Sequence, residues 1–167
     1  KEYWFERGWK TPPSVPVAAF DGNQVGVGAV ELEPGLSVQT MWGHIAWRLA
    51  GKAGYELFRN FDADRVAPGG EDIDNLLRLS GGGLIIVDEV ANYIETAAAV
   101  PVADSTLAAQ VLLFVQRLSG RVGSHAKTVL AATLTSKILE THGVASTEAV
   151  DRLRGVLGRV QKIREPV

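Results

Sequence analysis

The sequence of 167 residues contains no cysteine, no long apolar run and no initiator Met. Without cysteine the chain forms neither disulfides nor thiolate metal sites, which fits a cytoplasmic protein. No stretch reaches the roughly 18 apolar residues that a membrane-spanning helix needs. The opening "KEYWFERGWK" also lacks the apolar core of a signal peptide. We therefore expect a cytoplasmic protein without a membrane partner, and the missing Met suggests a fragment or a processed chain.

Acidic residues are scarce in the last third of the chain. Residues 117–167 contain 9 Lys/Arg and 4 Asp/Glu, a net charge of +5, whereas residues 1–116 contain 8 and 15, a net charge of −7. This asymmetry fits a C-terminal part that faces a nucleotide, a nucleic acid or an acidic neighbour. It also fits two ordinary solvated surfaces, and no residue demonstrates contact with nucleic acid. The length and the apolar fraction of 46% indicate one folded domain.

The motifs of several enzyme classes are absent as well. The phosphate-binding loop G-x-x-x-x-G-K-[ST] does not occur, and in its nearest match, "GRVGSHAKT" (120–128), Ala126 replaces the glycine before the lysine. In "VGVGAV" (25–30) the last glycine of G-x-G-x-x-G would fall on Glu31. There is no G-x-S-x-G, and the three histidines lie far apart in the sequence. The residues thus argue against a dinucleotide fingerprint, a hydrolase elbow and a histidine metal site.

Apolar runs typical of strands alternate with amphipathic segments typical of helices. Strands are predicted at "VPVAAF" (15–20, followed by the turn "DGN"), "LIIVDE" (84–89), "KTVLAATL" (127–134) and, less clearly, "QKIREPV" (161–167). Helices are predicted from an N-cap at Ser37 or Thr40 to Gly51, over "YELFRNF", over "EDIDNLLRLS", and at 105–120 and 146–160. "LIIVDE" shows no alternation, so both of its faces are expected to be buried. The order predicts an α/β sandwich with a mainly parallel sheet.

Two adjacent acids, Asp88 and Glu89, close the strand "LIIVDE". Ligands of parallel α/β sheets bind beyond the carboxyl ends of the strands. A hydrophobic strand followed by Asp-Glu is the pattern of a Walker B element, in which the Asp holds Mg²⁺ and the Glu polarises the attacking water. Alternatively, both carboxylates cap the helix that starts at residue 90. The residues alone leave these two interpretations open.

Taken in order, the segments resemble the core of an AAA-type P-loop ATPase, entered after its P-loop helix. More narrowly, the chain resembles the large prokaryotic predicted ATPases grouped as domain of unknown function 499. The resemblance spans residues 15–167 and is carried most specifically by "TMWGHIAWRLAG" and "LIIVDEVANYI". It implies a three-layer sandwich of P-loop ATPase type, and a division into an N-terminal extension (1–14) and a partial ATPase core (15–167).

The resemblance also implies roles for single residues. Asp88 matches the Mg²⁺-linked acid and Glu89 the catalytic base. Thr133, or else Thr135, matches the sensor of the γ-phosphate at the end of the next strand. Arg159, with Arg154 in reserve, matches an arginine finger that reaches a neighbour's nucleotide, although a cation at a helix C-terminus also has a purely structural explanation. The cofactors implied for the intact parent are ATP and Mg²⁺, and the parent is expected to form a homo-oligomer.

The chain departs from the family at the P-loop strand, which should lie between the strands at 127–134 and 162–167. We expect its place to be filled by "KEYWFERGW", by a partner such as an upstream ATPase segment carrying the P-loop, or by the last strand. The function expected is that of a fragment of an ATPase, itself inactive without the P-loop. The alternative is a non-catalytic α/β interaction domain whose basic C-terminal third binds a partner or DNA.

Overall fold

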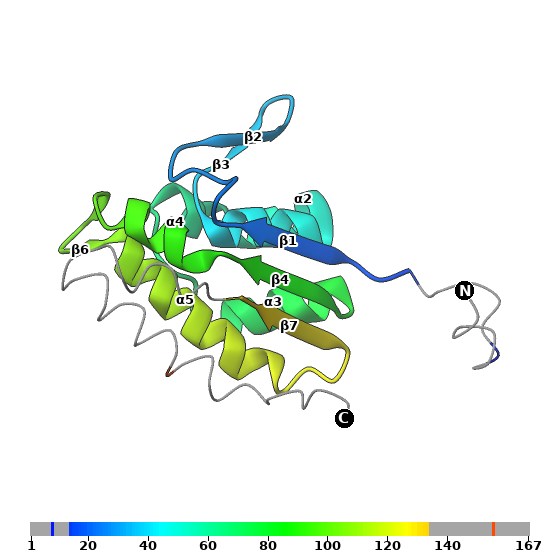
Figure 1. The fold of residues 1–167 in the computed structure, drawn as a ribbon. Coiled ribbons are helices and arrows are strands. Elements are labelled where there is room, and N and C mark those ends of the chain that lie inside the picture. The colour runs from blue at the N-terminus through cyan, green and yellow to red at the C-terminus, as the bar shows by residue number, and fades with distance from the viewer. Residues whose placement is uncertain (1–7, 9–13, 134–154, 156–167) are drawn as a thin grey trace.

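The computed structural model describes residues 14–133, together with Gly8 and Gly155. Most of the N-terminal extension and most of the segments predicted as a last helix and a last strand lie outside this part of the chain. The described elements are β1 (Val17–Asp21), β2 (Val30–Glu33), β3 (Leu36–Val38), α2 (Met41–Ala63), α3 (Gly70–Ser80), β4 (Gly83–Asp88), α4 (Val90–Ala97), β5 (Pro101–Val102), β6 (Ser105–Thr106), α5 (Leu107–Val122) and β7 (Thr128–Ala132) (Figure 1).

Three strands form one parallel sheet in the order β1-β4-β7. In the register, Asp21 lies opposite Asp88, and Val87 lies opposite Ala132. The three strands therefore end at the same edge of the sheet. This confirms the predicted α/β class and the mainly parallel sheet. Two short antiparallel pairs, β2–β3 and β5–β6, stand apart from it.

The helix α2 begins where the sequence predicts and contains the predicted break. The hydroxyl of its N-cap, Thr40, accepts a hydrogen bond from the Gly43 amide at 3.1 Å. Ala50 and Gly51 leave helical geometry, and Gly51 has a φ of 58°, which glycine adopts without strain. The helix resumes at once and continues to Ala63. The two helices predicted here are thus one element with a kink.

A buried carboxylate joins the start of α2 to its end. Asp62 is 1% exposed. It accepts hydrogen bonds from the Gln39 amide (3.1 Å to each oxygen), the Thr40 hydroxyl (2.5 Å) and the Tyr55 hydroxyl (3.2 Å). These bonds compensate the loss of water around a buried charge. The cluster thereby fixes the helix start that follows β3.

The core lies on one face of the sheet. Alternate strand residues, Ala18 and Phe20 in β1 and Ile85 and Val87 in β4, belong to one apolar cluster with residues of α2, α3, α4 and α5. α2 and α3 lie behind the sheet in Figure 1. α3 contacts both α2 and α5, and α5 also contacts α4. The sheet and the helices packed on this face therefore form two layers that enclose the core.

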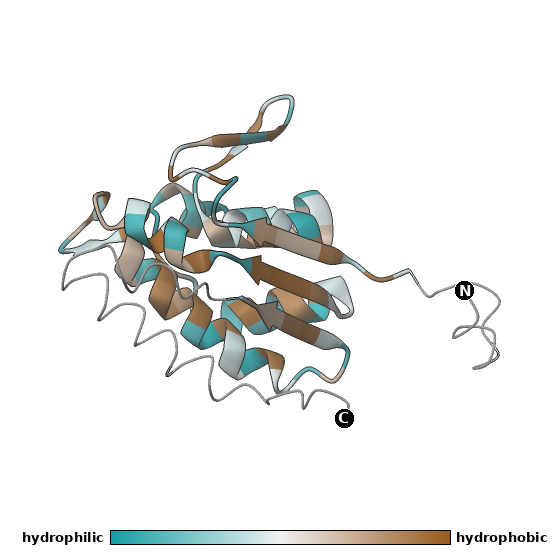
Figure 2. Cartoon of the chain, in the orientation of Figure 1, coloured by the Kyte–Doolittle hydropathy of each residue, from teal (hydrophilic) through white to brown (hydrophobic). Residues whose placement is uncertain are grey.

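The opposite face, here called the open sheet face, is apolar and accessible. It comprises Val17, Ala19, Leu84, Ile86, Val129 and Ala131. Val17 is 46% exposed and Val129 57%, and the strands carry hydrophobic colour in Figure 2. The prediction that both faces of β4 are buried is thus wrong for the described residues, since helices of this part cover one face only. The expected third layer is not formed by these residues either. Over the same ranges no helix has the length and apolarity to cross a membrane.

Candidate functional site

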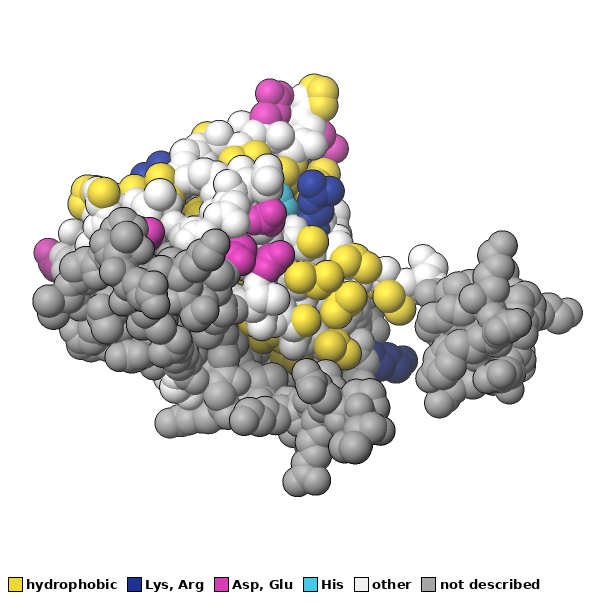
Figure 3. Space-filling model, in the orientation of Figure 1, with side chains coloured by type: hydrophobic (Ala, Val, Ile, Leu, Met, Phe, Trp, Pro, Cys, Tyr) yellow, Lys and Arg dark blue, Asp and Glu magenta, His cyan; other side chains and the backbone are white. Residues whose placement is uncertain are grey.

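Polar side chains gather where the three parallel strands end. Asp21 and Asp88 are the last residues of β1 and β4, and Thr133 follows β7 directly. Figure 3 shows acidic side chains beside the apolar surface of the open sheet face. This edge is where α/β sheets bind ligands, because the connections diverge there and leave room. The register thus brings together residues that are far apart in the sequence.

Thr133 links the two predicted acids. Its hydroxyl donates a short hydrogen bond to Oδ1 of Asp88 and accepts one from the backbone amide of Glu89 at 3.2 Å. Its own amide donates to the Val87 carbonyl at 3.0 Å, which continues the pairing of β7 with β4. The hydroxyl is therefore held between the strand end and the following turn. Asp88 and Glu89 are both half-buried.

Glu89 adopts a conformation that is unusual for a residue with a side chain. Its φ is 51° and its ψ is 35°, in the left-handed region, which costs a non-glycine residue roughly 1–2 kcal/mol. It occupies the N-cap position of α4, as the structural alternative predicted, but its side chain makes no capping hydrogen bond. Its carbonyl serves the helix by accepting from the Asn92 amide at 3.1 Å. Capping therefore accounts for the position of Glu89 and leaves its carboxylate without that role. Strain of this kind clusters at functional sites.

A glycine allows the loop after β1 to lie against the turn at Glu89. The Gly22 amide donates to the Asp88 carbonyl at 2.8 Å. A Cβ atom on Gly22 would lie 2.2 Å from the Glu89 carbonyl oxygen and 3.2 Å from Cβ of Tyr93. Any larger residue at position 22 would thus displace the strained turn.

Three residues of this edge were not singled out from the sequence. Asp21 Oδ1 accepts from the Asn23 amide at 2.8 Å, and Asn92 Nδ2 donates a short hydrogen bond to Asn23 Oδ1. This chain of bonds connects the end of β1 to the first turn of α4. The signal was present, because "VPVAAF" runs into Asp21 as "LIIV" runs into Asp88. As a turn signal, "DGN" does not by itself indicate this polar strand end.

Aromatic rings form the floor beneath this edge. Phe20 meets His44 and Tyr93 edge to face, at centroid distances of 5.7 and 5.0 Å. Burial, with a contribution from nearby Asp62, raises the pKa of Tyr93 to about 12. Burial, reinforced by Arg48, lowers the pKa of His44. Both groups are therefore neutral at pH 7, and the charge of the site comes from its carboxylates.

The donor set suits a hard cation that brings most of its own ligands. Among the described residues no three His, Cys, Asp or Glu side chains converge as a complete metal site. Mg²⁺ typically uses one or two carboxylates and takes its other ligands from water and phosphates. The carboxylate of Asp88, beside the Thr133 hydroxyl, fits that limited role. A cation held here would take its remaining ligands from water and phosphate.

Three of the predicted site residues, Asp88, Glu89 and Thr133, are brought together at this edge. Thr135, Arg154 and Arg159 lie outside the described residues. A family model described as the DUF499 N-terminal domain matches residues 14–164. No curated protein and no solved structure matches the chain.

Proposed function

The chain belongs to the family of the DUF499 N-terminal domain, and we propose that it is part of an ATP-hydrolysing, AAA-type P-loop ATPase. One observation carries the proposal. Asp88 ends the central strand, Glu89 follows it, and both are joined to Thr133, which follows the neighbouring strand. Capping of α4 leaves this arrangement unexplained, since the Glu89 side chain makes no capping bond.

In this proposal each residue has a separate task. The carboxylate of Glu89 accepts a proton from the water that attacks the γ-phosphate. Asp88 would hold Mg²⁺, which would supply neutralisation of charge on the phosphates. The Thr133 hydroxyl donates to a γ-phosphate oxygen when nucleotide is bound. Without nucleotide it positions Asp88. Two acids are required because metal binding and proton transfer occupy different atoms.

The phosphate-binding loop has to come from another polypeptide segment, because these 167 residues contain no G-x-x-x-x-G-K-[ST]. Within the described ranges β7 pairs with β4 alone. Its second edge is unpaired in that part of the chain, and this is where the P-loop strand of an AAA-type sheet would be needed. An unpaired strand edge of this kind readily accepts another strand. Without that segment we expect the chain to bind ATP weakly or not at all, and micromolar ATP affinity of the chain alone in a calorimetric titration would contradict this.

The proposal includes a homo-oligomer in which Arg159, or else Arg154, reaches the nucleotide of a neighbouring subunit. An arginine finger stabilises the charge of the transition state. Both residues lie in the basic C-terminal third of the sequence.

A second candidate function is supported by the open sheet face. Val17 and Val129 are about half exposed there, and exposed apolar patches mark interaction surfaces. A non-catalytic interaction domain would use this face and the basic C-terminal third to bind a partner or DNA. It would not need Glu89.

The test is ATP hydrolysis by a protein that contains both this chain and its P-loop segment. Glu89→Gln should lower kcat by about 10²- to 10⁴-fold, the range of a lost general base, while ATP binding persists. Glu33→Gln, an exposed acid of β2, is the matched control and should leave kcat unchanged. Equal hydrolysis by both variants would reject the proposed role and favour the interaction domain.

A further inference from the structure

A second polar site lies at the opposite end of the sheet from Asp88. A cavity of about 270 Å³ opens between the end of α3, the turn from α3 to β4, the loop from α5 to β7 and the first residue of β7. Its polar lining comes from Arg78, Ser124, His125, Lys127 and Thr128. β4 separates this cavity from Asp88 by about five residue steps, roughly 17 Å. The two sites are therefore distinct.

The cavity carries positive charge that its neighbours leave available. No carboxylate lines it. The Lys127 ammonium has no hydrogen-bond or ion-pair partner in the part of the chain that the structure describes. Arg78 donates from Nε to the Asp74 carbonyl (3.2 Å) and from one terminal nitrogen to Asn75 Oδ1 (2.8 Å). Those bonds occupy two of its five N–H donors. Arg78 and Lys127 can thus both turn donors to a ligand.

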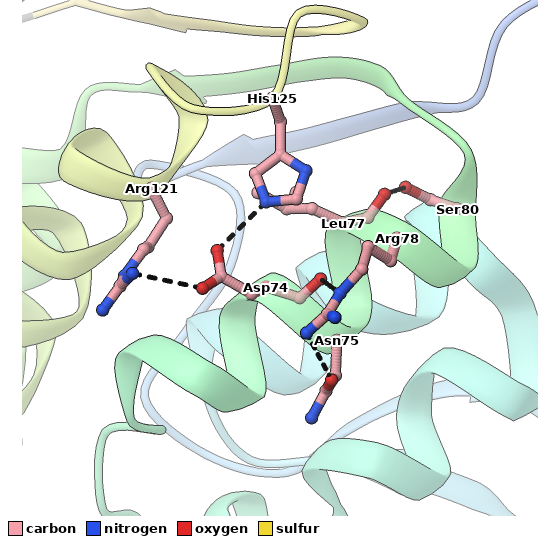
Figure 4. Close-up of polar contacts among 7 residues, drawn as sticks. All are labelled: Asp74, Asn75, Leu77, Arg78, Ser80, Arg121 and His125. Carbon is pink, nitrogen blue, oxygen red and sulfur yellow. Dashed lines mark hydrogen bonds and ion pairs between the residues drawn. The ribbon is translucent and has the colours of Figure 1, made fainter.

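The nearest acid shown already pairs with Arg121 and contacts the His125 ring. Figure 4 shows the Asp74 carboxylate between Arg121 and His125, with Arg78 on the other side. Its oxygens lie 3.2 Å from an Arg121 nitrogen and 3.0 Å from Nε2 of His125. The second ring nitrogen of His125 is on the side of the ring away from Asp74 (Figure 4). Asp74 therefore orients His125 at the cavity wall without bringing negative charge into the cavity.

A buried hydroxyl in the cavity wall lacks a partner. Thr128 is 8% exposed, and its Oγ1 makes no hydrogen bond within the described ranges. Buried hydroxyls are nearly always bonded, so an exception calls for an explanation. Rotation of the Thr128 side chain toward a ligand in the cavity would supply one. The hydroxyl of Ser124 is a further polar group of the lining.

Glycines allow the α3–β4 turn to pack closely against Lys127. Gly81 and Gly82 both line the cavity, with φ values of 70° and 112°. A Cβ on Gly82 would lie 2.5 Å from the Lys127 carbonyl oxygen and 2.6 Å from its Cβ. The α3–β4 turn thus approaches the α5–β7 loop more closely than residues with side chains would permit.

We propose that this cavity binds the phosphate group of a small phosphorylated molecule. The two cationic side chains offer donors only and the buried hydroxyl can add another, while a phosphate offers several acceptor oxygens and the matching charge. The cavity lies just below the range of about 300–1,000 Å³ typical of drug-sized ligands, so it admits one phosphate with a small substituent. The inference does not depend on ATP hydrolysis at Asp88.

The experiment is a titration of the ¹⁵N-labelled chain with inorganic phosphate and, separately, with glycerol 3-phosphate. Saturable shifts are expected at the amides of Gly81, Gly82 and residues 124–128. Tighter binding of glycerol 3-phosphate would identify a phosphate ester as the ligand, and equal binding would identify free phosphate. Lys127→Gln should weaken binding about tenfold or more, as loss of a charged hydrogen bond does. The control Lys52→Gln changes an exposed lysine outside the cavity and should leave binding unchanged.

Two further variants distinguish phosphate binding in this cavity from the candidate site at Asp88. Thr128→Val keeps the shape of the buried side chain, so it should fold normally and weaken phosphate binding several-fold. Asp88→Asn should leave phosphate binding intact. Absence of saturable shifts at millimolar phosphate, or equal binding by the Lys127→Gln and Lys52→Gln variants, would overturn the proposal. So would an oligonucleotide that shifts the same amides and is not displaced by phosphate.

Discussion

Replacing Gly22 with alanine should damage the candidate site through a single added carbon. The new Cβ would lie 2.2 Å from the Glu89 carbonyl oxygen, and real Cβ contacts essentially never fall under 3.0 Å. The two loops must therefore separate by about 0.8 Å, at a turn already held at a φ of 51°. The Gly22–Asp88 hydrogen bond of 2.8 Å is strained by the same movement.

The expected cost of Gly22→Ala is about 1–3 kcal/mol, the usual range for overpacking. In a domain of this size that lowers Tm by about 2–4 °C per kcal/mol. In an active assembly containing the P-loop, a displacement approaching 1 Å at Glu89 should lower kcat by up to about 10²-fold. Thermal unfolding, the amide shifts of Glu89 and Thr133, and the rate of ATP hydrolysis measure these effects.

The same loop supplies the control. Gly26 and Gly28 have nothing within 4 Å of an added Cβ, and neither has a positive φ. Gly26→Ala and Gly28→Ala should therefore change stability by less than about 0.5 kcal/mol. If Gly22→Ala unfolds like these controls and leaves the Glu89 and Thr133 amides in place, the close packing of the two loops is refuted.

Two further predictions concern buried polar groups. Asp62→Ala should lower the free energy of unfolding by about 3–5 kcal/mol in a denaturant titration, because three donors lose their buried acceptor. The exposed Asp104→Asn should cost little, and a similar small loss for Asp62→Ala would contradict the assigned role. His44, whose pKa is lowered by burial, binds fewer protons folded than unfolded. The contribution of His44 to the free energy of unfolding is full above pH 6.5. It is lost as the pH falls from 6.5 through the folded pKa of His44. His44→Phe should flatten the loss of stability in that window, and an unchanged pH profile would show that His44 is not its source.

Local signals predicted most of the elements. The N-cap at Thr40, the break at Gly51 and the glycine end of α3 are set by neighbouring residues, so they could be predicted from short segments. The apolar run before Asp88 predicted the central strand for the same reason. Its register with Asp21 and Thr133 was not visible, because pairing of distant strands leaves no local pattern. "DGN" is a turn signal and does not show that Asp21 is a polar strand end beside Asp88 and Thr133.

Burial of the sheet was mispredicted because periodicity does not report what packs on each face. Leu84 and Ile86 are apolar without belonging to the core cluster, whereas Ile85 and Val87 belong to it. The second cavity was missed for a related reason. Arg78 lies in the last turn of α3 and Lys127 in the loop before β7, and the two meet only when β4 and β7 align. In the sequence, Lys127 belongs to "GRVGSHAKT" (120–128), which does not match the phosphate-binding loop.

Asp88, Glu89 and Thr133 are proposed to face a metal-bound nucleotide. Mn²⁺ shares the oxygen ligands of Mg²⁺ and broadens nearby NMR signals. The direct test is to add Mn²⁺ and ATP to the ¹⁵N-labelled chain assembled with its P-loop segment and to record the amide signals. We predict selective broadening of the amides at 21–23, 88–92 and 133, which Asp88→Asn abolishes. Broadening elsewhere, or the same pattern in the Asp88→Asn variant, would contradict the claim.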